Sequence, residues 1–206
     1  MTTTQDSIKL DFDSWNIKIT ENDRRNVLKL YVKLNKEESM AFKNFMSNDF
    51  SVCRINFRGV GKSDGEFDNG QGELADAAAA LDWLERENFD NSQCWISGFS
   101  FGSLISMQLL MRRPEINRFI AISPQPNVYD FSFLSPCPSS GLIIYGKKDE
   151  LVPIEHIEEL NKRLSAQTGI KVEFESVPDA NHFFSKAEKP LIKSLNNYIK
   201  KESALY

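Results

Sequence analysis

Apolar and polar positions along this chain follow two alternating patterns. Short apolar runs bounded by polar residues or glycine predict strands at residues 8–12, 15–20, 26–33, 51–56, 93–97, 117–123, 141–145 and 171–177. Apolar residues at helical spacing predict helices at residues 39–46, 72–87, 101–112, 153–167 and 185–200. This alternation predicts an α/β fold with a mostly parallel sheet and helices on both faces. We expect the first strands to be antiparallel additions at one edge.

The apolar positions are sufficient for one core. The chain has 206 residues, of which 41% are hydrophobic, and it contains no internal repeat or linker, so residues 1–206 fit a single domain. The helix predicted at 72–87 is rich in alanine. Leu74, Ala78, Leu81 and Leu84 form one stripe along it, which we expect to pack closely on the sheet.

Charge and hydropathy exclude several partners. The chain carries 25 basic and 29 acidic residues, which gives a net charge of −4 and argues against nucleic acid or anionic membranes. No apolar stretch approaches the roughly 18 residues of a membrane span. Residues 1–6 lack the basic and apolar regions of a signal peptide, so we expect a cytoplasmic protein.

Cysteine and histidine content argues against a metal site. The three cysteines are widely spaced, and Cys53 and Cys94 fall in predicted strands. We interpret these two as buried small apolar residues in a protein of a reducing compartment. No Cys/His spacing indicates zinc, and the only two histidines, His156 and His182, are far apart. We therefore expect no metal, and the serine chemistry inferred below requires no cofactor.

Ser100 is the first candidate for chemistry. It is the central residue of a G-x-S-x-G motif at 98–102, between a predicted strand and a predicted helix. This order is typical of a nucleophile elbow, in which a tight turn exposes the serine hydroxyl above the sheet. The following helix directs its first amides at an oxyanion, so the Phe101 amide is the candidate oxyanion donor. A glycine-serine turn without chemistry is the alternative.

A serine nucleophile needs a histidine and an acid. His182 follows the strand predicted at 171–177, at the sheet edge where sites of parallel α/β proteins form. His156 lies among glutamates on a predicted helix, and we interpret it as a solvated residue. Asp149 follows the strand predicted at 141–145 and would hold the His182 imidazole. Glu150 and Asp179 are the neighbouring alternatives. Asp149 could also cap the following helix.

Four segments together resemble a known family. They are residues 56–65, residues 98–102, residues 146–149 with Val152 and Pro153, and residues 181–184. In order and spacing they are similar to the small bacterial α/β-hydrolases without a cap domain, near the dienelactone-hydrolase and serine-peptidase-like branches. The resemblance covers the chain from about residue 49 onward. It implies the α/β-hydrolase fold, with Ser100 as nucleophile, Asp149 as acid and His182 as base.

The N-terminal part, about residues 1–48, departs from this family pattern. Residues 1–58 contain no glycine, proline or histidine, whereas related hydrolases place a His-Pro and glycine-rich loop there to supply a second oxyanion donor. A backbone amide of Val32, Lys33 or Leu34 is the alternative donor.

The segment 124–138 separates two predicted strands at the place where larger relatives insert a lid. Its four prolines and three aromatic residues predict an ordered loop too short for a cap domain. We expect Tyr129, Phe131 and Phe133 to wall the acyl pocket. A hydrophobic plug beneath the helices is the alternative for the same three residues.

These observations predict a serine hydrolase that cleaves carboxylic esters, or thioesters, through an acyl-enzyme. Its partner would be a small-molecule ester, and the sequence leaves open whether the chain forms a homodimer. Two alternatives follow from the short N-terminal part. The chain could be a catalytically impaired relative that acts as a binding protein, or an enzyme that a partner chain completes.

Overall fold

The computed structural model describes residues 27–32, 50–61, 63–87 and 93–204. Six strands form one sheet in the order β2-β1-β3-β4-β5-β6, and every pair of neighbours is parallel. The strands are β1 (Val27–Val32), β2 (Ser51–Ile55), β3 (Gln93–Phe99), β4 (Ile116–Ile122), β5 (Gly141–Gly146) and β6 (Val172–Val177). The expected parallel α/β sheet is confirmed. The strands predicted at 8–12 and 15–20 and the helix predicted at 39–46 lie outside the described residues.

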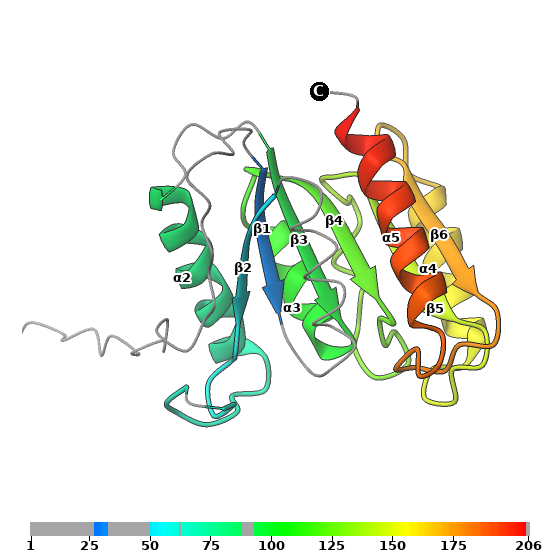
Figure 1. Ribbon diagram of the computed structural model, residues 1–206, viewed down its shortest axis with the longest axis horizontal. Helices are drawn as coiled ribbons and strands as arrows, with labels where there is room; N and C mark the ends of the chain where they lie inside the picture. Colours follow the sequence, from blue (N-terminus) through cyan, green and yellow to red (C-terminus); the bar gives the residue numbers. More distant parts are fainter. Residues whose placement is uncertain (1–26, 33–49, 62, 88–92, 205–206) are drawn as a thin grey trace, which may run out of the picture.

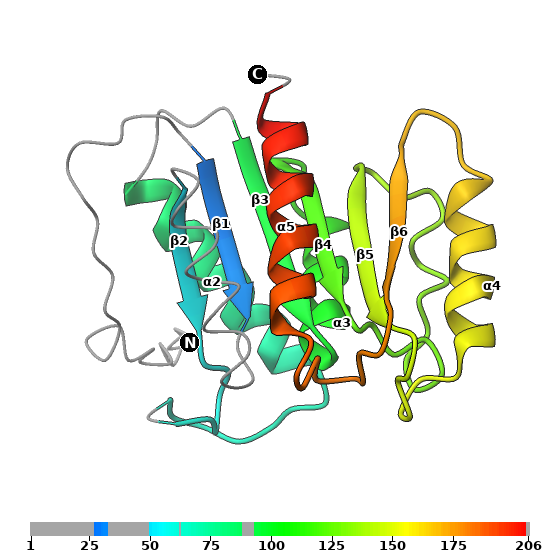
Figure 2. The same cartoon turned by 45° about the vertical axis from the view of Figure 1, so that its right-hand side comes forward.

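Helices cover both faces of this sheet. They are α2 (Gln71–Glu87), α3 (Phe101–Leu110), α4 (Ile154–Ser165) and α5 (Glu188–Ser203). Figure 1 shows α2 and α3 packed along the sheet, and Figure 2 shows α5 on the opposite face. The two faces bury separate apolar clusters, one that includes α2, α3 and α4 and one that includes α5. In β3, Cys94 and Ile96 point into the first cluster and Trp95 and Phe99 into the second, as expected for a strand buried on both faces.

Several boundaries differ from the sequence prediction. β3 continues through Gly98 and Phe99 instead of ending at residue 97, because Gly98 leaves room for the first turn of α3. α5 begins at Glu188 and not at 185, because Phe184 and Lys186 adopt positive φ values that no helix tolerates. The expected stripe of α2 is confirmed at Leu81 and Leu84, which are buried, whereas Leu74 and Ala78 are half-buried against the same core cluster. Ala77 and Ala80, which the prediction did not include, are also buried.

The connection from β4 to β5, residues 123–140, contains no helix or strand. The sequence predicted an ordered loop too short for a cap domain, and the structure agrees. None of the described helices is long and apolar enough to cross a membrane. No cluster of potential metal ligands occurs among the described residues.

The three cysteines are buried, as expected for Cys53 and Cys94. Burial raises the pKa of the Cys53 and Cys94 thiols to about 12 and also raises that of Cys137. The thiolate is the reactive form, so at about pH 8 the folded protein is expected to react with a disulfide reagent such as DTNB far more slowly than the unfolded chain. Stopped-flow absorbance with and without urea measures both rates. Equal rates would contradict the buried placement.

Candidate active site

Ser100 lies at the sharp turn between β3 and α3. Its backbone has φ 52° and ψ −118°, a conformation that non-glycine residues rarely adopt. One hydrogen bond and one close approach of the backbone hold this strained turn. The Ser100 amide donates to the Ile122 carbonyl (2.8 Å), and a Cβ on Gly98 would lie only 2.1 Å from the Gly102 carbonyl oxygen. The local geometry is that of the nucleophile elbow expected from the motif.

Phe101 is the first residue of α3, so its N–H has no acceptor within the helix. The amide is therefore available at the N-terminal end of the helix dipole, next to Ser100. Val32 ends β1, and Lys33 and Leu34, the other two candidates for a second oxyanion donor, lie outside the described residues.

His182 lies beside Ser100, although 82 residues separate them. Its Nε2 is 2.9 Å from Ser100 Oγ, and its side chain is 3% exposed. The backbone of His182 is anchored to the sheet, because Ser123 Oγ donates to its carbonyl oxygen (2.9 Å). The rings of Phe99 and Phe183 pack against the imidazole, with centroids 5.3 Å and 5.1 Å away. These contacts fix the ring in one orientation.

Asp149 is the carboxylate that meets this imidazole. Its Oδ2 lies 2.8 Å from His182 Nδ1, and its side chain is 4% exposed. Its Oδ1 accepts the backbone N–H groups of Leu151 (2.9 Å) and Val152 (3.0 Å). The α4 N-cap position is Pro153, so Asp149 orders the turn before the helix and does not cap it.

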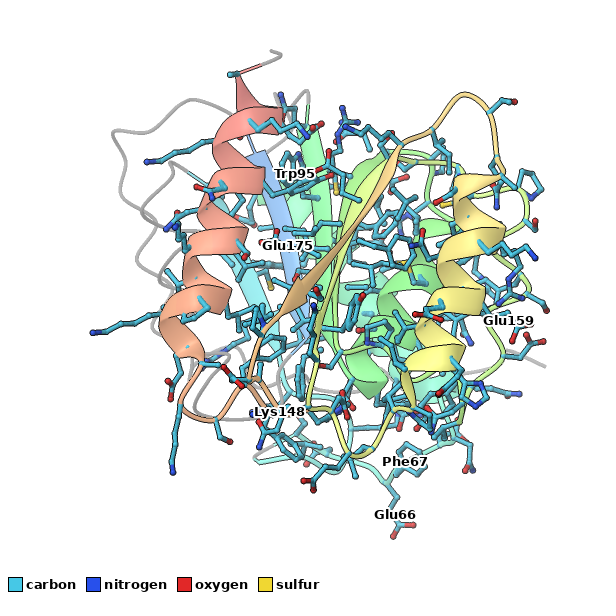
Figure 3. All side chains as sticks on the ribbon, turned by 90° about the vertical axis from the view of Figure 1, so that its right-hand side faces the viewer. Glu66, Phe67, Trp95, Lys148, Glu159 and Glu175 are labelled. Atoms are coloured by element: carbon cyan, nitrogen blue, oxygen red, sulfur yellow. The ribbon has the colours of Figure 1, made fainter. Side chains whose placement is uncertain are left out.

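The alternative acids point elsewhere. Asp179 is exposed and pairs with the Lys148 ammonium at 2.6 Å, and this hydrogen bond lowers the pKa of its carboxyl. Glu150 is exposed, as is His156. Figure 3 shows Lys148 and Phe67 at the sheet edge where the strands end, the edge that carries the site.

The loop that carries Asp149 and the loop that carries His182 touch at Gly146. The Lys148 amide donates to the Ala180 carbonyl (2.9 Å), and a Cβ on Gly146 would lie 2.2 Å from that same oxygen. Only glycine permits this approach. The contact sets the separation between Asp149 and His182.

Aromatic side chains cluster around Phe101, the residue that follows Ser100. The ring of Phe101 contacts Phe57, Phe67 and Tyr129, with centroids 5.6–5.9 Å apart. Of the three expected pocket residues, Tyr129 thus lies next to the residue that follows Ser100. Phe131 is buried in the core and stacks on Phe133, which is the arrangement of the plug alternative.

Ser123 and Gln125 were not predicted from the sequence. Both follow β4, the strand next to β3, and Gln125 Oε1 lies 2.9 Å from Ser100 Oγ. Their position at the carboxyl end of a central strand was a usable signal, because sites of parallel sheets form there.

Comparison with known proteins gives a consistent result. A family model described as alpha/beta hydrolase fold matches residues 34–141. An uncharacterised protein of Rickettsia prowazekii (strain Madrid E) is 48% identical over 169 residues, which cover 80% of this chain and 71% of the relative.

Two solved structures are similar along most of their length. A protein of unknown function from Agrobacterium tumefaciens, provisionally assigned to the alpha/beta hydrolases, is 41% identical with a TM-score of 0.85, covering 90% of this chain and 88% of that one. A Xanthomonas campestris protein, described as a serine hydrolase without lid, is 29% identical with a TM-score of 0.75, covering 85% and 81%.

Proposed function

Because this chain belongs to the alpha/beta hydrolase fold family, we propose that it is a serine hydrolase of carboxylic esters. The observation that carries the proposal is the continuous path of contacts from Ser100 Oγ through the His182 ring to Asp149 Oδ2, with distances of 2.9 Å and 2.8 Å. A nucleophile, a base and an orienting acid within hydrogen-bonding reach are what acyl transfer requires.

The proposed reaction has two halves. Ser100 Oγ attacks the ester carbonyl carbon while its proton passes to His182 Nε2, and the Phe101 N–H stabilises the resulting oxyanion. The C–O bond to the alcohol then breaks as His182 returns the proton to the departing oxygen. Water attacks the acyl-serine by the same route, His182 takes and returns its proton, and the carboxylic acid leaves. Asp149 keeps the proton on Nδ1 and stabilises the imidazolium.

The rim of the site supports apolar ester substrates. Phe67 is 62% exposed, Val128 is 58% exposed and Phe183 is 41% exposed, and each lies in a loop that follows a strand. An apolar acyl or alcohol group would cover these side chains and thereby gain hydrophobic free energy. Tyr129, beside Phe101, is the proposed wall of the acyl pocket. Thioesters would fit the same chemistry.

Labelling with a fluorophosphonate tests the proposal, because this probe phosphonylates only an activated serine. The wild type is expected to label at Ser100, and both Ser100→Ala and His182→Ala are expected to lose labelling. Gel fluorescence and peptide mass spectrometry give the readout.

Ser165→Ala and His156→Ala are the matched controls. Ser165 bonds Asn161 on the exposed face of α4, and His156 is exposed on the same helix, so both variants are expected to label like the wild type. Folded wild type that does not label, or Ser100→Ala that still does, would refute the proposal and favour a binding protein with an inactive triad.

A further inference from the structure

Ser100 Oγ has a second polar neighbour besides His182. The Gln125 side-chain amide reaches it from the loop after β4, with Oε1 at 2.9 Å. Pro124 and Pro126 flank Gln125 and restrict its backbone. The Gln125 carbonyl oxygen accepts the N–H groups of Val128 and Tyr129, each at 3.0 Å. The backbone from which the amide extends is therefore held by an ordered turn.

The protons at this site determine which amide atom faces the serine. His182 Nδ1 faces the Asp149 carboxylate, so Nδ1 carries a proton and Nε2 accepts one. Ser100 has a single proton, which goes to Nε2. A carbonyl oxygen at the Gln125 position would then face lone pairs on Oγ, whereas an N–H there would donate to them. A half-turn of the amide exchanges its O and N without moving any other atom.

Gln125 also restricts how a substrate approaches. Oγ is tetrahedral: one direction is the bond to Cβ, one points to His182 and one points to Gln125. One direction remains for the carbonyl carbon. This third contact restricts the hydroxyl rotamer and leaves a single line of attack, which is the kind of orientation that raises reaction rates.

We propose that Gln125 is a positioning residue, whose side-chain amide donates an N–H to Ser100 Oγ and orients it toward the acyl carbon. This inference rests on the proposed function. As the Ser100 proton passes to His182, the same N–H faces the negative charge that develops on Oγ, and it stays hydrogen-bonded to that oxygen in the acyl-enzyme.

Two substitutions separate a donor from an acceptor. Gln125→Met keeps the length and removes the donor, and it is expected to lower the second-order rate of fluorophosphonate labelling about tenfold. Gln125→Glu places a carboxylate there, which only accepts and competes with His182 for the Ser100 proton. Compared with the wild type at the same pH, its rate is expected to be about 100-fold lower near pH 8, and the difference is expected to shrink toward about pH 5, as the carboxyl becomes protonated and can donate.

The control is Gln108→Met, the same substitution at a half-buried glutamine in the last two turns of α3. It is expected to label like the wild type. Hydrolysis of p-nitrophenyl butyrate is expected to show the Gln125→Met loss in kcat with little change in KM, since the contact is to the nucleophile. Thermal melting checks that the variants fold.

If the wild type labels, the proposed function stands, and either of two results would then overturn the proposal for Gln125. One is a Gln125→Met rate equal to that of Gln108→Met. The other is a Gln125→Glu variant that keeps the wild-type rate and pH profile, which would mean that Gln125 accepts the serine proton. Failure of the wild type itself to label would instead refute the proposed function.

Discussion

Asp149→Asn is expected to lower kcat about 10⁴-fold while leaving the fold intact. Oδ1 accepts N–H groups from Leu151 and Val152, so the asparagine oxygen must occupy that position. Its NH₂ group then faces His182 Nδ1 and donates to it. This forces the histidine proton onto Nε2, where the ring can no longer accept the proton of Ser100.

Steady-state hydrolysis of a p-nitrophenyl ester measures this loss. Asp179→Asn is the matched control, because its carboxylate is exposed and pairs with Lys148 instead of the base. The control is expected to stay within about twofold of the wild type. A loss of less than about tenfold in Asp149→Asn would mean that the carboxylate does not set the tautomer of His182.

Gly98→Ala is expected to destabilise the protein by about 3 kcal/mol and to slow labelling of Ser100 at least about 100-fold. The new Cβ would lie 2.1 Å from the Gly102 carbonyl oxygen and 2.4 Å from Ser106 Oγ. The Gly102 carbonyl belongs to the backbone of the first turn of α3 and cannot move without shifting the helix, and Ser106 Oγ donates a hydrogen bond to that same oxygen (2.7 Å). Because Ser100 joins β3 to α3, a shift of the helix moves Ser100 away from His182.

Urea unfolding followed by circular dichroism measures the stability change. Gly169→Ala separates steric overlap from backbone strain: Gly169 has φ +86°, but a Cβ there would meet no atom within 4 Å. This control is expected to cost only about 1 kcal/mol. Equal losses in the two variants would show that the close approach of α3 to β3 contributes nothing.

The sequence predicted well whatever depends on the ends of strands. Ser100, Asp149 and His182 each follow an apolar run, and parallel strands bring their carboxyl ends to one edge. Their arrangement therefore followed from the order of elements together with the local motifs. Which of Asp149 and Asp179 reaches His182 depends on the backbone turn after β5. The structure brings Asp149 to the imidazole.

Other features depended on contacts that leave no local pattern. Gln125 meets Ser100 only because β4 neighbours β3, and the surrounding prolines indicated merely an ordered loop. The start of α5 was predicted too early because Phe184 and Lys186 adopt positive φ values without being glycine. The buried face of α2 is wider than the predicted stripe and includes Ala77 and Ala80, because alanine side chains are small enough to lie against the sheet beside Leu81 and Leu84.

The long sequence separation between Ser100, Asp149 and His182 has a consequence for folding. Ser100 and His182 are 82 residues apart, and Asp149 and His182 are 33 apart, so every contact among the three is non-local. They meet only after β3, β4, β5 and β6 have paired in register, and such distant pairings form slowly. The proposed reactivity of Ser100 would thus be a property of the finished sheet, and a partly folded chain is expected to carry an ordinary hydroxyl at position 100.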